Sequence, residues 1–159
     1  MTEKDYSGTP LWKKLGLKPG LKLFVSSAPY PPVLAQIRPL LKEFRPVSHP
    51  RDADVQLFFT TSRERLQSHI VMATVMPPDG GLWIAWPKKS SGLNEELQND
   101  LTFEIVQRIG LDAGLVDNKS CSIDADWQAL RFVIRKGDRA DWPAALKRPT
   151  RASPAPDGS

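Results

Sequence analysis

The sequence has 159 residues, which is the length of one ordinary domain that can bury a core without disulfide or metal staples. It is 40% hydrophobic and 25% charged with a formal net charge of +4, a globular composition that permits an anionic partner without requiring one. Cys121 is the only cysteine, which excludes an internal disulfide and a multi-cysteine zinc site. No apolar run approaches the roughly 18 residues needed to span a bilayer, so we expect a cytoplasmic protein without membrane contact.

The first half of the chain alternates apolar, β-favouring runs with helical patterns. Thr9 and Pro10 are suited to begin a short helix, and Gly16 is suited to end it. The expected elements that follow are a strand over residues 21–25, a helix over 33–41, a short strand over 45–48, a loop at 49–52 and a strand over 54–59. The last of these strands is the strongest, because its apolar residues are also β-favouring.

The second half repeats the alternation and ends in a hairpin. A helix with Leu66, Ile70 and Val71 as apolar positions is expected after the strand at 54–59, and a turn at 77–81 ends it. The remaining expected elements are a buried strand over 82–86, one amphipathic helix over 94–110 that stops at Gly110 or Gly114, and strands over 115–123 and 129–136. Residues 124–128 are too few for a crossover helix, so the last two strands should be antiparallel.

These elements predict an α/β fold with a doubly wound, mostly parallel sheet of about six strands, whose last strand is made antiparallel by the C-terminal hairpin. The domain is expected to span residues 6–136, between a flexible N-terminus at 1–5 and a polar, largely disordered extension at 137–159. The order of elements is similar to a shortened class I methyltransferase domain, which is Rossmann-like. The segments 15–20 and 77–81, each before a strand, resemble lead-ins of that fold.

A closer resemblance spans about residues 6–135. It is carried by Tyr6-Ser7-Gly8-Thr9-Pro10-Leu11, Lys13-Lys14-Leu15-Gly16, Trp86-Pro87-Lys88-Lys89, Gly114-Leu115-Val116-Asp117-Asn118-Lys119, and Trp127 with Leu130-Arg131-Phe132-Val133. In these segments the chain resembles the bacterial domain-of-unknown-function family 3052. The resemblance implies relatives but no chemistry, because that family has no established activity.

An ordinary S-adenosylmethionine site is not expected. The methyltransferase fold usually cradles this cofactor with a glycine-rich turn after its first strand, where backbone must approach the ligand closely. Here that turn is residues 26–32, which contain three prolines and no glycine. An acidic residue for ribose hydroxyls is also missing near Val47 and Ser48, with Asp52 the nearest candidate. We therefore expect no cofactor, and a divergent methyltransferase remains the alternative.

An anion site is the leading functional hypothesis. Polar segments follow three parallel strands, and such strands bring the residues after them to one carboxyl edge of the sheet. Two of these segments also precede helices, whose free N–H groups attract negative charge. The hairpin turn should lie near the same edge. The candidate ligand-binding residues are Ser26, Ser27, Thr60, Thr61, Ser62, Trp86, Lys88, Lys89, Ser90, Asp126 and Trp127.

A structural role is open for each of these groups. The hydroxyls can cap helices, the lysines can be solvated, and the tryptophans can pack in the core. Asp124 and Asp126 can form an acid–base pair or a metal site, but turn aspartates more often bond their own backbone. Cys121 is expected to be a structural thiol, and 117–119 a bulge or turn that interrupts its strand. No catalytic or metal-binding residue is therefore expected.

The sequence predicts a non-catalytic, methyltransferase-like binding or interaction module with a site for phosphate or carboxylate. The partner would be a small anionic ligand. One alternative is an enzyme, the divergent S-adenosylmethionine-dependent methyltransferase. Another is weak nucleic-acid binding through the lysines and a basic tail at 144–159.

Overall fold

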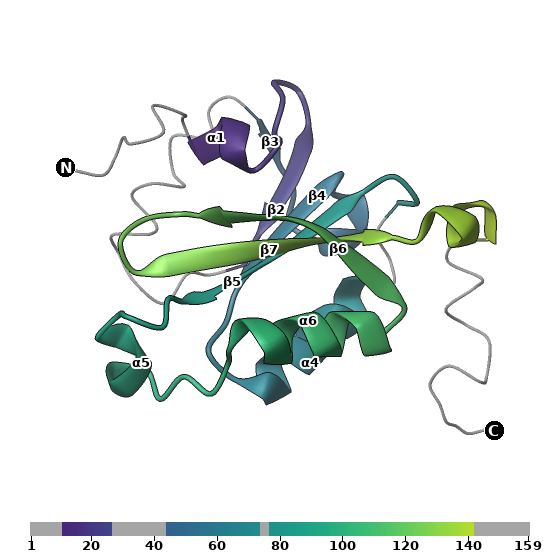
Figure 1. Cartoon of the computed structure of the whole chain (residues 1–159). Helices are drawn as coiled ribbons and strands as arrows, with labels where there is room; N and C mark the ends of the chain where they lie inside the picture. Colours follow the sequence, from purple (N-terminus) through teal and green to yellow (C-terminus); the bar gives the residue numbers. More distant parts are fainter. Residues whose placement is uncertain (1–10, 27–43, 74–76, 142–159) are drawn as a thin grey trace.

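The computed structural model describes residues 11–26, 44–73 and 77–141. Within them, six strands form one sheet in the order β3-β2-β4-β5-β7-β6 (Figure 1). The strands are β2 (Lys22–Val25), β3 (Arg45–Pro46), β4 (Val55–Phe59), β5 (Gly81–Pro87), β6 (Leu115–Ser122) and β7 (Trp127–Ile134). β3, β2, β4 and β5 pair in parallel, whereas β7 is antiparallel to both of its neighbours. The predicted fold class, including the C-terminal hairpin, is confirmed.

Helices cover both faces of this sheet. They are α1 (Leu11–Lys14), α4 (Arg63–Ala73), α5 (Leu93–Glu96) and α6 (Phe103–Asp112), with 3-10 turns η1 (Pro50–Asp52) and η2 (Lys136–Asp141). α4 and α6 lie side by side on one face, and α1 lies toward the other (Figure 1). None of the helices in the described residues is long and apolar enough to cross a membrane.

The central strand β5 is buried along its whole length. Because successive side chains of a strand point to opposite faces, β5 contributes side chains to two separate core clusters, one on each face of the sheet. Trp83 packs with Leu15, Leu17 and Leu23 on one face, while Trp86 packs with residues of α4 and α6 on the other. Trp83 Nε1 also donates to the carbonyl oxygen of Leu15 at 3.0 Å, which satisfies its polar atom. Large apolar side chains buried in this way contribute about 1.5–3 kcal/mol each.

The turn before β2 has the predicted chemistry. The N–H of Leu21 donates to the carbonyl of Lys18 at 3.1 Å, and Gly20 adopts φ 86°. Proline at the second position and glycine with positive φ at the third are what a type II turn requires. The turn therefore directs the chain into the sheet as the sequence predicts.

The expected single helix over residues 94–110 is wrong. The structure has two helices there, α5 and α6, separated by an irregular segment. Gln98 adopts φ 52°, a left-handed conformation that a helix cannot continue through. Thr102 then caps α6, since its hydroxyl accepts from the N–H of Ile105 at 3.2 Å. The polar run 98–100 and the capping Thr102 therefore outweigh the apolar residues spaced four apart.

Smaller differences have local causes. The expected loop at 49–52 forms η1, because the His49 ring nitrogen accepts from the N–H of Arg51. Val71 is exposed on α4 rather than part of its apolar face. Gly110 lies inside α6, and Gly114, with φ 96°, follows its end. The helix predicted at 33–41, the Thr9 cap and the tail at 144–159 lie outside the described residues.

Candidate functional site

The loop after β5 is held against the turn of the β6–β7 hairpin. The N–H of Lys88 donates to the carbonyl of Asp126 at 2.7 Å. The hydroxyl of Ser91 donates to the carboxylate of Asp126 at 2.8 Å, and the amide of Asn94 donates to the carbonyl of Lys88 at 2.7 Å. Two segments far apart in the sequence are thus joined at the carboxyl end of β5. Asp126 positions this loop.

The hairpin turn is shaped by its own aspartate. The Asp124 carboxylate accepts from the N–H groups of Asp126 and Trp127, both at 2.8 Å. This is the backbone bonding that a turn aspartate favours. Trp127 is the first residue of β7 and 1% exposed, with its ring edge-on to Phe59 at 5.4 Å. Its side chain therefore belongs to the core.

The two lysines line a pocket of about 430 Å³ that we call the cationic pocket. It is lined by Lys88, Lys89, Ser90, Phe103, Ser120, Cys121, Ser122 and Gln128. The ammonium group of Lys88 donates to the hydroxyl of Ser122 at 2.6 Å, and that hydroxyl donates to the carbonyl of Asp124 at 3.2 Å. Lys14 also reaches this strand, donating to the carbonyl of Ser122 at 3.3 Å. Lysines and hydroxyls thus gather here, and none of the described residues in the lining is a carboxylate.

The thiol in this pocket stays protonated. Burial raises the pKa of Cys121 to about 11, although Lys14, Lys119 and Lys88 act in the opposite direction. A thiol is nucleophilic only as the thiolate. Cys121 is therefore a half-buried structural side chain and not a nucleophile at neutral pH.

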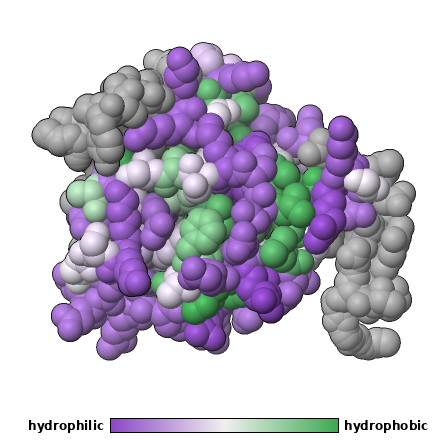
Figure 2. Space-filling view, in the orientation of Figure 1, coloured by the Kyte–Doolittle hydropathy of each residue, from purple (hydrophilic) through white to green (hydrophobic). Residues whose placement is uncertain are grey.

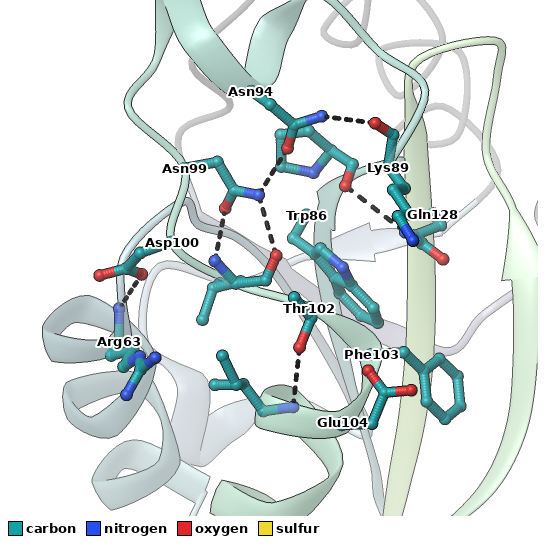
Figure 3. A pocket seen from close by; sticks show the side chains of 13 residues that line it. Arg63, Trp86, Lys89, Asn94, Asn99, Asp100, Thr102, Phe103, Glu104 and Gln128 are labelled. Atoms are coloured by element: carbon teal, nitrogen blue, oxygen red, sulfur yellow. Dashed lines mark hydrogen bonds between the residues drawn. The ribbon is translucent and has the colours of Figure 1, made fainter.

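A second hollow lies beside the first, which we call the aromatic pocket (Figure 3). Its volume is about 610 Å³, and its lining is Arg63, Trp86, Pro87, Lys89, Asn94, Asn99, Asp100, Leu101, Thr102, Phe103, Glu104, Ile105 and Gln128. Trp86 is 1% exposed and forms its floor, whereas Phe103 is 38% exposed. The two rings are 6.2 Å apart between centroids and inclined at 60°. Lys89, Phe103 and Gln128 line both pockets.

Side-chain amides brace the wall of the aromatic pocket. Asn99 donates to the side-chain oxygen of Asn94 at 2.7 Å and to the carbonyl of Leu101 at 3.0 Å (Figure 3). Its own oxygen accepts from the N–H of Leu101 at 3.1 Å. In the same segment, the Asp100 carboxylate accepts from the backbone N–H of Arg63 at 2.9 Å. These bonds fix the segment between α5 and α6, which forms this wall.

Sequence reasoning missed this second pocket because residues 94–110 were expected to be one helix. A continuous helix would have used the backbone N–H of Leu101 in its own hydrogen bonds, whereas in the structure this N–H donates to the side chain of Asn99. The available signal was the polar run Gln98-Asn99-Asp100 followed by a capping Thr102. Read as a helix boundary, it would have placed these residues in a loop beside the carboxyl end of β5.

The other predicted site residues serve the backbone at the ends of β2 and β4. The hydroxyl of Ser26 accepts from the N–H of Phe59 at 3.0 Å, and the backbone N–H of Ser26 donates to the carbonyl of Leu57 at 2.9 Å. Thr60 is 1% exposed, and its N–H donates to the carbonyl of Ala85 at 3.0 Å. Ser26 and Thr60 line neither of the two pockets.

The helix that follows β4 begins as predicted. The Ser62 hydroxyl accepts from the N–H of Arg65 at 3.1 Å and so caps α4. The carbonyl of Thr61 accepts from the N–H of Asp100 at 3.0 Å, which ties this loop to the aromatic pocket wall. Ser27 lies outside the described residues. The predicted set therefore divides, with Trp86, Lys88, Lys89 and Ser90 lining the pockets and the hydroxyl residues organising the loops.

His69 and Asp117 line neither of the two pockets. His69 stacks on Phe58 with ring centroids 4.3 Å apart, and burial, assisted by the Arg65 charge, lowers the pKa of His69 to about 4. The Asp117 carboxylate accepts from the amide of Gln107 at 3.1 Å, next to the predicted bulge in β6, which is confirmed. Across the described residues, no group of three or more His, Cys, Asp or Glu side chains is arranged to hold a metal ion.

Comparisons with known proteins bear on the fold alone. No family model matches the chain, and no match is found among curated proteins, so membership of family 3052 stays a prediction. Among solved structures, the mitomycin 7-O-methyltransferase MmcR is similar with a TM-score of 0.50 and 14% identity, over 73% of this chain and 49% of that chain. The chain has a methyltransferase-like fold. It spans about half the length of that enzyme.

A second similar structure is the N-methyltransferase NodS from Bradyrhizobium japonicum WM9. Its TM-score is 0.49 and its identity 12%, over 81% of this chain and 94% of that chain. Identities this low describe architecture and carry no residue roles. Function must therefore be argued from the two pockets.

Proposed function

We propose that this chain is a methyltransferase-like binding module whose cationic pocket holds a small anion, phosphate or carboxylate. The observation that carries the proposal is the cluster around Lys88, whose ammonium group lies 2.6 Å from the Ser122 hydroxyl in a pocket that also contains Lys89. Among the described residues, no carboxylate lines this pocket. A ligand there would meet positive charge and hydroxyl groups together.

The chemistry of the pocket supports an anionic ligand. A lysine ammonium carries three N–H donors, and the bond to Ser122 uses one of them while fixing the direction of the others. Ser90 and Ser120 add hydroxyls that can donate to phosphate or carboxylate oxygens. Charge-assisted hydrogen bonds of this kind are roughly twice as strong as neutral ones. The pocket is therefore suited to an oxyanion.

The states of the Cys121 thiol and the Asp124 carboxylate favour binding over catalysis. The raised pKa of Cys121, about 11 through burial, keeps the thiol protonated. The nearby Asp124 carboxylate accepts two backbone N–H groups of its own turn. Neither group is poised as nucleophile or base in the cationic pocket.

Isothermal titration with inorganic phosphate tests the proposal. Lys88→Gln should weaken binding by about tenfold or more, because a charge-assisted contact contributes about 1.5–3 kcal/mol. The matched control is Lys136→Gln, which removes the same charge from η2, beyond the opposite end of the sheet, and should leave affinity unchanged (Figure 1). Equal loss in both variants, or no binding by the unaltered chain, would refute the anion site.

Two rival functions give different results in the same assays. If the chain is a divergent methyltransferase, it should bind S-adenosylmethionine with micromolar affinity. A heat of binding of that kind in the isothermal titration would overturn the non-catalytic proposal. Weak nucleic-acid binding predicts affinity that falls steeply with salt and is lost when residues 144–159 are removed. Phosphate binding with no heat from S-adenosylmethionine supports the small-anion module.

A further inference from the structure

We propose that the cationic and aromatic pockets together bind one ligand, a planar aromatic or heteroaromatic ring that carries a phosphate group. The phosphate would contact Lys88 and Lys89, and the ring would stack on Phe103. This inference rests on the proposed function, because it takes the anion site as given. It adds the chemical class of the molecule that bears the anion.

The first argument is the continuity of the two pockets. Lys89, Phe103 and Gln128 line both of them, so a single molecule can occupy both. Figure 3 shows Lys89 beside Gln128 on one side of the aromatic pocket, with Arg63 and Asp100 on the other. A phosphate next to Lys89 would therefore leave the rest of its molecule at the mouth of the aromatic pocket.

The second argument is the exposure of Phe103. Among the described residues, the exposed large apolar side chains are Val71, on the outside of α4, and Phe103, which lines both pockets. The neighbouring Trp86 ring supports it from the buried side at 6.2 Å, while the N-cap at Thr102 fixes the start of its helix. An exposed aromatic ring held in a concave site offers a stacking surface at little entropic cost.

The third argument is the charge distribution along the two pockets. The aromatic pocket is lined by Glu104 and Asp100 as well as Arg63, whereas the described lining of the cationic pocket contains lysines and no carboxylate. A ligand with an anion at one end and ring N–H donors at the other matches this difference. The visible face of the protein is otherwise mostly hydrophilic, with apolar areas enclosed by polar ones, which favours a small ligand over a broad docking surface (Figure 2).

The test compares four probes by isothermal titration: inorganic phosphate, phenyl phosphate, adenosine monophosphate and adenosine. At least one of the two ring-bearing phosphates should bind about tenfold tighter than inorganic phosphate, because stacking of one ring typically adds this much. Adenosine, which lacks the phosphate, should bind more weakly than adenosine monophosphate. The variant Phe103→Leu keeps apolar bulk but removes the ring, and should abolish the tenfold gain.

The tenfold gain is the ratio of two affinities measured in the same variant, so a change of inorganic-phosphate affinity in Phe103→Leu, whose side chain also lines the cationic pocket, does not affect it. Folding of Phe103→Leu is checked separately by its circular dichroism spectrum and urea midpoint, which should match those of the unaltered chain. If phosphate binds but neither ring-bearing phosphate binds tighter, this inference is overturned and the proposed function stands. A gain that persists in Phe103→Leu also overturns it. If none of the phosphate compounds binds, the proposed function fails, and this inference with it.

Discussion

Replacing Gly110 by alanine should destabilise the fold, although alanine is the better helix former. Gly110 is buried in α6 where this helix crosses β7. A methyl group there would overlap three carbon atoms of the Phe132 ring, which is 0% exposed and cannot swing aside into solvent. Overpacking of this kind costs about 1–3 kcal/mol, and the upper end applies to a rigid buried ring. The higher helix propensity of alanine offsets about 1 kcal/mol of this cost, so we expect the free energy of unfolding to fall by about 2 kcal/mol.

Urea unfolding followed by circular dichroism measures this loss. The control is Gly92→Ala, because a methyl group at Gly92 meets no atom within 4 Å and its φ of −67° suits alanine. Its stability should change by less than about 0.5 kcal/mol. Adding Phe132→Leu should make the two changes non-additive, because a smaller side chain relieves the overlap. A Gly110→Ala variant as stable as the unaltered chain would refute close packing of α6 on the sheet.

Three further changes have defined outcomes. Burial, and secondarily the Arg65 charge, lowers the pKa of His69 to about 4 in the folded chain, whereas its ordinary pKa of 6.5 applies in the unfolded chain. Between about pH 6.5 and pH 4 only the unfolded chain takes up this proton, so the free energy of unfolding should fall across that range and not change above it. In urea titrations, His69→Gln should flatten this fall. With its pKa raised to about 11, Cys121 should react with a thiol reagent at neutral pH at least about tenfold more slowly than free cysteine, and an equal rate would contradict its burial. Asp124→Ala should cost about 1–2 kcal/mol by thermal unfolding, because two backbone N–H groups lose their acceptor, whereas Asp124→Asn, which keeps an acceptor oxygen, should cost less.

The sheet could be predicted from the sequence because its strands carry strong local signals. The run 82–86 is apolar throughout, as a strand buried on both faces must be, and β5 is buried along its whole length. The short link at 124–128 leaves no room for a crossover, which correctly predicts an antiparallel hairpin. These features depend on neighbours in sequence, so no tertiary knowledge was needed.

The site was predicted only in part, because its geometry depends on contacts between distant segments. Lys88 and Lys89 were singled out by their place after β5, but nothing local shows that Ser122, from the far end of β6, would meet Lys88. The break at Gln98 was hidden by apolar residues at helical spacing on both sides of it. The exposed ring of Phe103 follows from that break, so its role could not be recognised either.

The claim that an anion binds in the cationic pocket is tested most directly by an amide NMR titration with inorganic phosphate. The account predicts saturable shift changes centred on Lys88, Lys89 and Ser90 and on residues 120–122, which line the same pocket. The amides of Ser26 and Thr60, which bond across the ends of β2, β4 and β5, should not move. Changes centred on Ser26 and Thr60, or no saturable change at Lys88 to Ser90, would contradict it.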